Sequence, residues 1–300
     1  MTRRSLFATI VATVTALTLW PAASASAAER PAHSSLGPVY YLALGDSLAQ
    51  GVQPDSSGAS VITNHGYVDD LYALYRRTYP QLRLVKLGCP GETTTSMING
   101  GVCPATAYRP FHAKDQLDAA AHFLKSHRGQ VALVTLDIGA NNVDGCVTAA
   151  GLDPACVQTG IATAGTDLVK ILRKLHAADP SARIVGMNYY DPFLAAWVQG
   201  TAGQQTAQAS VQLTDFFNRV LAADYLHFKV PVADVAAEFR TDDFTVIPLV
   251  HLPVNVASVC LLTWMCASPP VGPNIHANTL GYRVIADAFV DTIGPVLRRG

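Results

Sequence analysis

The sequence predicts an α/β protein in which a five-stranded parallel sheet lies between two layers of helices. Five short runs rich in Val, Ile, Leu and Tyr are typical of strands, and they alternate with segments whose apolar residues follow helical spacing. The strand runs are almost continuously apolar, as expected where both faces of a sheet are covered. Strand–helix alternation favours parallel strands joined by right-handed crossovers. We expect one domain over residues 39–300.

These patterns predict five strands and five helices. The expected strands are "VYYLALGD" (39–46), "LRLVKLG" (82–88), "VALVTLDIG" (131–139), "RIVGMNYY" (183–190) and "VPVADV" (230–235). The expected helices cover residues 66–79, 113–127, 157–178, 205–227 and 279–297. The apolar, Pro-rich stretch 241–278 lacks helical spacing, so an ordered loop is expected there. This loop either covers the sheet or forms an apolar wall beside a site.

The N-terminal segment has the pattern of a secretory signal peptide over residues 1–27. Arg3 and Arg4 precede an apolar run from residue 6 to 20, and small residues follow. The run is shorter than the roughly 20 residues of a membrane-spanning helix, which favours cleavage over anchoring. We therefore expect a secreted, extracellular protein with a flexible N-terminus over residues 28–38.

Six cysteines agree with an oxidising compartment, where thiols pair and close loops. Pairing between sequence neighbours needs the least loop closure. The expected pairs are Cys89 with Cys103, Cys146 with Cys156, and Cys260 with Cys266. The sequence has no C-x-x-C and no H-E-x-x-H, so neither a redox dithiol nor a metal site is predicted.

Charge argues against a nucleic-acid partner. The formal charge is −1 and charged residues make up 14% of the chain, without a basic stripe to neutralise phosphates. Removing the two arginines of the signal peptide takes the formal charge from −1 to −3. A small-molecule or lipid substrate, no cofactor and a monomeric state are expected.

Polar residues follow the predicted strands at the edge where open α/β sheets bind ligands. Ser47 follows the first strand, and "GCPGETT" (88–94) and "DIGANN" (137–142) follow the next two. These residue types suit acyl transfer, in which a serine attacks, a histidine takes its proton and fixed donors hold the oxyanion. We assign Ser47 as nucleophile and His276 as base. The oxyanion donors are then the N–H groups of Ser47 and Gly91 and the side chain of Asn141.

The same residues carry a family resemblance. "GDSL" at 45–48, "PGET" at 90–93, "GANN" at 139–142 and "NIHAN" at 274–278 resemble the four blocks of SGNH hydrolases, the GDSL lipases and esterases. Secreted actinobacterial members also share "NYYDPF" at 188–193. The resemblance implies a flavodoxin-like three-layer α/β/α sandwich and ester hydrolysis through a serine acyl-enzyme, without a metal.

Two positions depart from the family pattern. The third block usually reads G-x-N-D, but Asn142 follows Asn141 here. The family usually places the triad aspartate three residues before the histidine, and Pro273 stands there in this chain. The imidazole of His276 therefore needs another partner for its second nitrogen, because that partner sets the tautomer.

Three partners for His276 remain open at this point. A backbone carbonyl of the loop 270–274 is favoured, because prolines, Pro273 among them, stiffen that loop. The side-chain oxygen of Asn274 and a remote carboxylate, such as Asp191 or Asp144, are the other two. A carbonyl or an amide would stabilise the imidazolium less than the aspartate of a full triad does, and would leave the pKa of His276 lower.

The substrate is less well determined by the sequence. Phe193, Trp197 and Leu249 are named as substrate-pocket residues, and the apolar loop 244–265 favours lipid or fatty-acyl esters, with transient contact to a lipid surface. One alternative is a carbohydrate acetylesterase, which would need a more polar groove. The other is a catalytically silent binding protein on the same scaffold, because the usual aspartate is replaced by proline.

Overall fold

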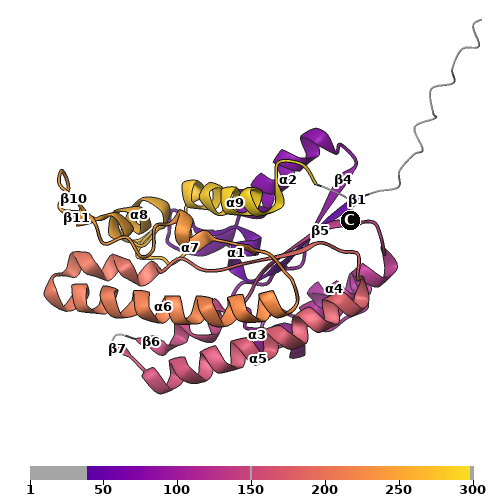
Figure 1. Ribbon diagram of the computed structural model, residues 1–300, viewed down its shortest axis with the longest axis horizontal. Coiled ribbons are helices and arrows are strands. Elements are labelled where there is room, and N and C mark those ends of the chain that lie inside the picture. The colour runs from indigo at the N-terminus through magenta and orange to yellow at the C-terminus, as the bar shows by residue number, and fades with distance from the viewer. Residues whose placement is uncertain (1–38, 149–150, 298–300) are drawn as a thin grey trace, which may run out of the picture. The chain divides into compact units, whose positions relative to one another are not determined.

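A computed structural model describes residues 39–148 and 151–297 (Figure 1). Its five-stranded sheet is built from β1 (Val39–Gly45), β4 (Leu82–Lys86), β5 (Val131–Asp137), β8 (Ile184–Met187) and β9 (Val232–Ala233). The strands lie in the order β4-β1-β5-β8-β9 and every pairing is parallel. In chain order this is 2-1-3-4-5, the flavodoxin-like arrangement. The predicted fold class is confirmed, and the predicted signal peptide (1–27) and N-terminus (28–38) lie outside the described residues.

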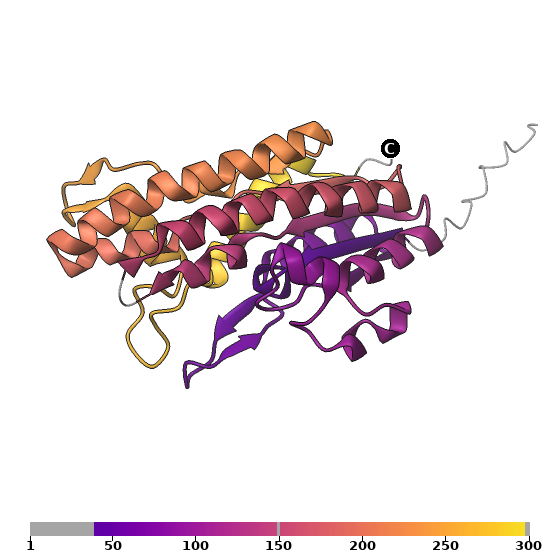
Figure 2. The same ribbon diagram turned by 90° about the horizontal axis from the view of Figure 1, so that it is seen from below.

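Helices cover both faces of the sheet. On one side lie α2 (Tyr67–Thr78), α7 (Val235–Glu238), α8 (Val254–Leu262) and α9 (Thr279–Ile293). On the other side lie α3 (Thr94–Asn99), α4 (Gln116–Ser126), α5 (Pro154–Ala178) and α6 (Thr201–His227). Figures 1 and 2 both show α5 and α6 running side by side. The five expected helices are all present, with ends that shift by a few residues.

Shorter elements complete the chain. Among the described residues, the remaining strands form three two-stranded hairpins: β2 (Val52–Pro54) with β3 (Ser60–Ile62), β6 (Val147–Thr148) with β7 (Gly151–Leu152), and β10 (Val246–Ile247) with β11 (Leu252–Pro253). The short helices are α1 (Ser47–Gln50) and the 3₁₀ turns η1 (Ala105–Ala107), η2 (Arg109–Phe111), η3 (Ala140–Asn142), η4 (Asp144–Cys146) and η5 (Pro192–Gln199). Within the described residues, no helix combines the length and the apolarity needed to cross a membrane.

The core packs aromatic side chains between the sheet and both helical layers. Tyr67 of α2 and Phe289 of α9 stack with ring centroids 4.9 Å apart. On the opposite face, Gly186 of β8 makes room for Tyr225 of α6, because a Cβ at that glycine would lie 2.3 Å from the tyrosine ring. This close approach fixes α6 against the sheet, which matters because α6 forms one side of the site described below.

The stretch 241–278 differs from the expected loop. It contains the hairpin β10–β11 and the nine-residue helix α8. Val256 and Val259 of α8 pack with Leu194 and Ala195 of η5, while Leu261 on the same helix is exposed. Because α8 carries apolar residues on its exposed face as well, the sequence shows no helical periodicity there. The loop prediction was therefore wrong for these residues.

All three disulfides form between sequence neighbours, as predicted. Cys89 pairs with Cys103, Cys146 with Cys156, and Cys260 with Cys266. The first closes a loop beside the proposed oxyanion glycine, and the third lies shortly before His276. The pairing prediction is confirmed.

Candidate active site

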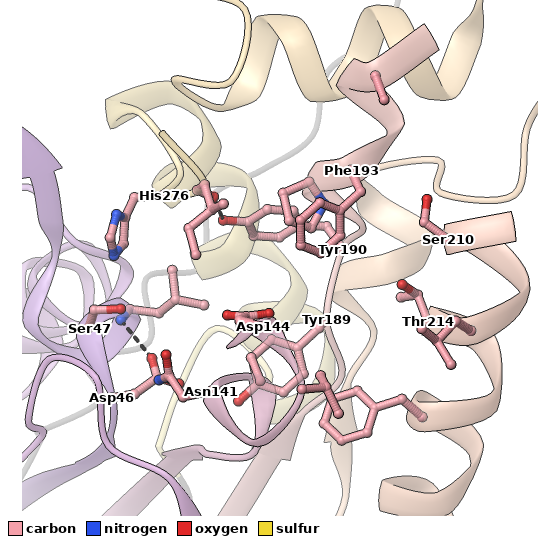
Figure 3. A pocket seen from close by; sticks show the side chains of 18 of the residues that line it. Asp46, Ser47, Asn141, Asp144, Tyr189, Tyr190, Phe193, Ser210, Thr214 and His276 are labelled. Carbon is pink, nitrogen blue, oxygen red and sulfur yellow. Dashed lines mark hydrogen bonds between the residues drawn. The ribbon is translucent and has the colours of Figure 1, made fainter. Parts of the chain in front are cut away.

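The four residues assigned to catalysis meet at the point where the strand order reverses. β1 and β5 are neighbours in the sheet, and ligands of such folds bind in the crevice between strands of this kind. Ser47 follows β1 on α1, and Asn141 follows β5 on η3. Together with Gly91 and His276 they line one cavity of about 970 Å³ (Figure 3).

Ser47 occupies the first position of the one-turn helix α1. Asp46 caps this helix, because its Oδ1 accepts a hydrogen bond of 3.0 Å from the N–H of Leu48. The N–H of Asp46 itself donates to Oδ1 of Asp137 at 2.9 Å. Burial raises the pKa of Asp46 to about 7. Asp46 therefore shapes the turn that presents the serine, and the N–H of Ser47 lies in the first helical turn, where amides lack intrahelical acceptors.

Gln116 at the start of α4 holds the residue before this turn. Its Oε1 accepts from the N–H of Gly45 at 2.7 Å, and its Nε2 donates to the carbonyl of Gly45 at 2.9 Å. The same Nε2 donates to Oε2 of Glu92 at 3.2 Å, so one buried amide joins the nucleophile turn to the loop of Gly91. Sequence reasoning missed Gln116, because a single glutamine at a helix start carries no motif.

The loop after β4 places Gly91 beside the serine. Gly91 has a φ of 81°, in the left-handed region that favours glycine. Its N–H donates to no acceptor in the described part of the chain. Asn141 ties this loop to the nucleophile turn, because its Nδ2 donates to the carbonyl of Glu92 at 2.9 Å and to Oδ2 of Asp46 at 3.3 Å. The side chain assigned to the oxyanion site is thus also a structural bridge.

Asn142, which stands where the family usually has aspartate, has a structural role. Its Oδ1 accepts from the N–H of Thr94 at 3.0 Å and its Nδ2 donates to Oγ1 of Thr94 at 2.9 Å. An ionised carboxylate could accept the first bond but could not donate the second. The amide therefore fastens the start of α3 to the strand end that carries Asn141.

The partner of His276 is the side chain of Asn274. Nδ1 of His276 lies 2.7 Å from Oδ1 of Asn274, and the backbone N–H of His276 donates to the same oxygen at 3.1 Å. Because a backbone N–H can only donate, the shared atom must be the amide oxygen. Nδ1 must then carry a proton, which leaves Nε2 with a free lone pair. Figure 3 shows the imidazole beside Ser47 with a ring nitrogen turned toward the serine.

This geometry corrects the favoured interpretation of a backbone carbonyl from the loop 270–274, and it leaves Pro273 without a direct role. Asn274 lies only two residues before His276, so its short side chain folds back onto both donors. Burial alone lowers the pKa of His276 to about 4, and no carboxylate contributes to its pKa. Neither Asp144 nor Asp191 is therefore the partner. The histidine is neutral over most of the pH range.

The far side of the cavity is formed by α6, η5 and the segment after β8. Phe193 lines it, as predicted for a pocket residue, together with Ser210, Thr214 and Phe217 of α6. No residue of the stretch 244–265 lines it, so that stretch is not a wall of this cavity; its helix α8 packs against η5 and α9 instead. A helix was predicted at 205–227, but its cavity-lining residues were missed, because they resemble the face of an ordinary helix.

Two predicted pocket residues lie elsewhere. Trp197 packs against Phe244 with ring centroids 5.7 Å apart and does not line the cavity. Leu249 lies between β10 and β11, where it is 89% exposed. Trp197 turns away because η5 buries its neighbours Leu194 and Ala195 against α8. Both assignments were therefore wrong.

Asp144, one of the remote carboxylates considered as a partner for His276, lines the cavity instead. Its carboxyl lies within the cavity, between Ser47 on one side and α6 on the other (Figure 3). Burial and the nearby Asp191 raise the pKa of Asp144 to about 7. In the described part of the chain, no three His, Cys, Asp or Glu side chains are grouped to hold a metal ion.

Comparisons with known proteins agree with this fold. The sequence profile described as the GDSL-like lipase/acylhydrolase family matches residues 43–284, and the chain belongs to this family. The fold resembles phospholipase A1 from Streptomyces albidoflavus, with 20% identity, a TM-score of 0.56, and coverage of 85% of this chain and 100% of that one. It also resembles an extracellular lipase from Streptomyces rimosus, with 17% identity, a TM-score of 0.56, and coverage of 85% and 99%. A search of curated proteins finds no matching relative.

Proposed function

We propose that this protein is a secreted carboxylic-ester hydrolase, a lipase or esterase, that acts on lipid or fatty-acyl esters through an acyl-enzyme on Ser47. The observation that carries the proposal is the hydrogen bond between His276 and Asn274. This bond keeps the proton on Nδ1 and leaves Nε2 able to accept the serine proton. Membership of an acylhydrolase family supports the same reaction class.

In the first half of the reaction, Oγ of Ser47 bonds to the ester carbonyl carbon while Nε2 of His276 takes its proton. The carbonyl oxygen gains a negative charge, which the N–H groups of Ser47 and Gly91 stabilise. Asn141 supplies a third donor. Its 3.3 Å contact with Asp46 is longer than its 2.9 Å bond to Glu92, so the oxyanion replaces the weaker one.

In the second half, the imidazolium of His276 gives its proton to the leaving alcohol as the carbon–oxygen bond breaks. A water molecule then attacks the acyl-enzyme, and Nε2 takes the water proton. The tetrahedral intermediate collapses, Ser47 recovers its proton and the free acid leaves. Asn274 acts as a positioning residue throughout, since its side-chain oxygen bonds to His276 while its Nδ2 donates to Oγ of Ser60 at 3.2 Å.

Features around the site support the rest of the proposal. Phe193 and Phe217 give a cavity of about 970 Å³ an apolar lining that suits an acyl chain. The exposed Leu249 and Val250 suit contact with a lipid surface. Three disulfides and the signal-peptide pattern of residues 1–27 support secretion of one hydrolase domain over residues 39–300.

The test is hydrolysis of p-nitrophenyl esters from acetyl to dodecanoyl by the mature, oxidised protein. We expect turnover that favours medium and long chains and disappears in Ser47→Ala. The control Ser126→Ala, at an exposed position on α4, should remain active. Activity confined to acetyl esters would replace the fatty-acyl substrate with the acetylesterase alternative. If wild type and Ser47→Ala are equally inert toward all esters, the binding-protein alternative replaces catalysis.

A further inference from the structure

The cavity beside Ser47 contains a carboxyl group that the proposed reaction does not use. Asp46 and Asp144 are the carboxylate residues among its described lining, and no Lys or Arg lines it. The carboxyl of Asp46 is occupied by Leu48 and Asn141. The carboxyl of Asp144 accepts no hydrogen bond from the described part of the chain. An acceptor is therefore available to a ligand inside the cavity.

The surroundings of Asp144 make this acceptor unusual. Figure 3 shows its carboxyl in the middle of the cavity, near Tyr190 and Phe193, with Ser47 on one side. Ser210, across the cavity, already donates its hydroxyl proton to Asp191 at 2.5 Å. Asp144 is half-buried, and a carboxyl whose contact with water is reduced without a donor in exchange carries a cost. A substrate that brings a donor would remove that cost.

The charged residues that line the cavity disfavour anionic ligands. Without a basic residue in the described lining, nothing neutralises an anionic group on a chain that enters the cavity. Asp144 accepts a hydrogen bond in its ionised form and in its protonated form, and the ionised form is the stronger acceptor. A neutral donor such as a hydroxyl fits both forms. A plain alkyl chain fits neither well.

We propose that Asp144 is a specificity residue that accepts a hydrogen bond from a hydroxyl on the acyl chain, so that the enzyme favours hydroxylated acyl esters over plain alkyl esters. The inference rests on the proposed function, because the acyl chain must run from Ser47 into the cavity. It adds a hydroxyl subsite to the apolar lining that Phe193 provides.

The first test compares p-nitrophenyl octanoate with a series of hydroxyoctanoates in which the hydroxyl moves along the chain. At the best position, wild type should show kcat/KM about tenfold higher than for the plain ester, the size expected for one hydrogen bond to a charged group. Asp144→Leu should abolish this preference, and Asp144→Asn, which keeps an acceptor oxygen, should keep part of it. Asp291→Asn on the exposed side of α9 is the matched control and should behave as wild type.

The preference should also depend on pH. Burial and Asp191 give Asp144 a pKa of about 7, so it is mostly ionised above neutrality. The ratio of hydroxylated to plain ester hydrolysis should therefore rise between about pH 5.5 and about pH 8.5. The other titratable groups facing it are Asp46, Asp191, Tyr189, Tyr190 and His276. Asp144→Leu retains all of them, so a flat ratio in that variant assigns the dependence to Asp144.

Two results would overturn the inference: a ratio near one at every hydroxyl position in wild type, or a preference that survives Asp144→Leu. A binding measurement keeps it testable without catalysis. In calorimetry with Ser47→Ala, octanediol with hydroxyls at both ends should bind more tightly than octanol. Adding Asp144→Leu should remove the difference. Equal binding of the two alcohols would count against the subsite, whereas loss of all ester turnover would count only against the proposed function.

Discussion

The two sides of the cavity are built differently. On the serine side, side chains bond to backbone groups of neighbouring strand ends: Gln116 to Gly45, Asn141 to Glu92, and Asn142 to Thr94. On the α6 side, the apolar residues Phe193, Leu213 and Phe217 line the cavity, and Ser210 bonds to the side chain of Asp191 rather than to a strand end. The proposed reacting groups are therefore held by directional hydrogen bonds, whereas the shape of the cavity beside them depends on helix packing.

The largest effect on kcat is expected from substituting Gln116, which supports the serine side of the cavity. Gln116→Leu removes both bonds to Gly45 and the bond to Glu92, so the nucleophile and the Gly91 loop lose their shared support. We expect kcat to fall about a hundredfold with little change in KM, because misplaced oxyanion donors weaken transition-state binding only. Steady-state kinetics on a folded variant, checked by circular dichroism, measure this. The control is Gln158→Leu at an exposed position on α5, and an equal fall in kcat in both variants would contradict the assignment.

A smaller effect is expected at Asn274, which reaches the site from the connection before α9. Asn274→Ala removes the acceptor at Nδ1 of His276, so the ring loses its fixed tautomer. Loss of one hydrogen bond to a group that becomes charged should lower kcat about ten- to a hundredfold. Unchanged kcat in this variant would mean that another atom orients the histidine.

A different substitution at Asn274 tests the same contact through the pH dependence of kcat/KM. The base works only when neutral, so kcat/KM falls as pH drops through the pKa of His276, which burial sets at about 4. Asn274→Asp places a carboxylate beside the imidazolium and should raise that pKa, moving the acidic limb upward by about one to three pH units. Asp46 and Asp144 are present in both proteins, so the difference between the two profiles belongs to the histidine. Coincident acidic limbs would contradict this geometry.

The smallest effects are expected away from the cavity. Leu249→Ser changes an 89% exposed side chain and should leave hydrolysis of soluble short esters within about twofold of wild type.

Phe193→Ala, by contrast, should raise KM for octanoyl esters severalfold, because Phe193 lines the cavity. Kinetics on acetyl and octanoyl esters separate the two variants. A strong loss of activity toward soluble esters in Leu249→Ser would mean that Leu249 contacts the substrate after all.

The same contrast explains what the sequence could predict. Strand ends lie next to their strands in the chain, so Ser47, Gly91 and Asn141 could be placed from local patterns and the sheet rule. The partner of His276 could only be narrowed to three choices, because it depends on how the side chain of Asn274 folds back. Residues of α6 could not be found, since which face of a long helix borders a cavity depends on tertiary packing.

Other errors have the same origin. Trp197 and Leu249 have the apolar character of pocket residues, but neither lines the cavity. Trp197 packs against Phe244, and Leu249 is exposed between β10 and β11. Gln116 bonds to residues far from it in the chain, and only the fold brings them together. Short-range geometry was therefore predictable, whereas contacts between distant elements were not.

The most direct measurement is covalent labelling with a fluorophosphonate, which reports an activated serine without assuming a substrate. Intact-mass spectrometry of the oxidised protein should show one adduct, and peptide mapping should place it on Ser47. Labelling should be absent in Ser47→Ala and slowed by orders of magnitude in His276→Ala, because Nε2 no longer takes the proton. Labelling at another residue, or equal rates with and without His276, would contradict the account of Ser47 and His276 as the reacting pair.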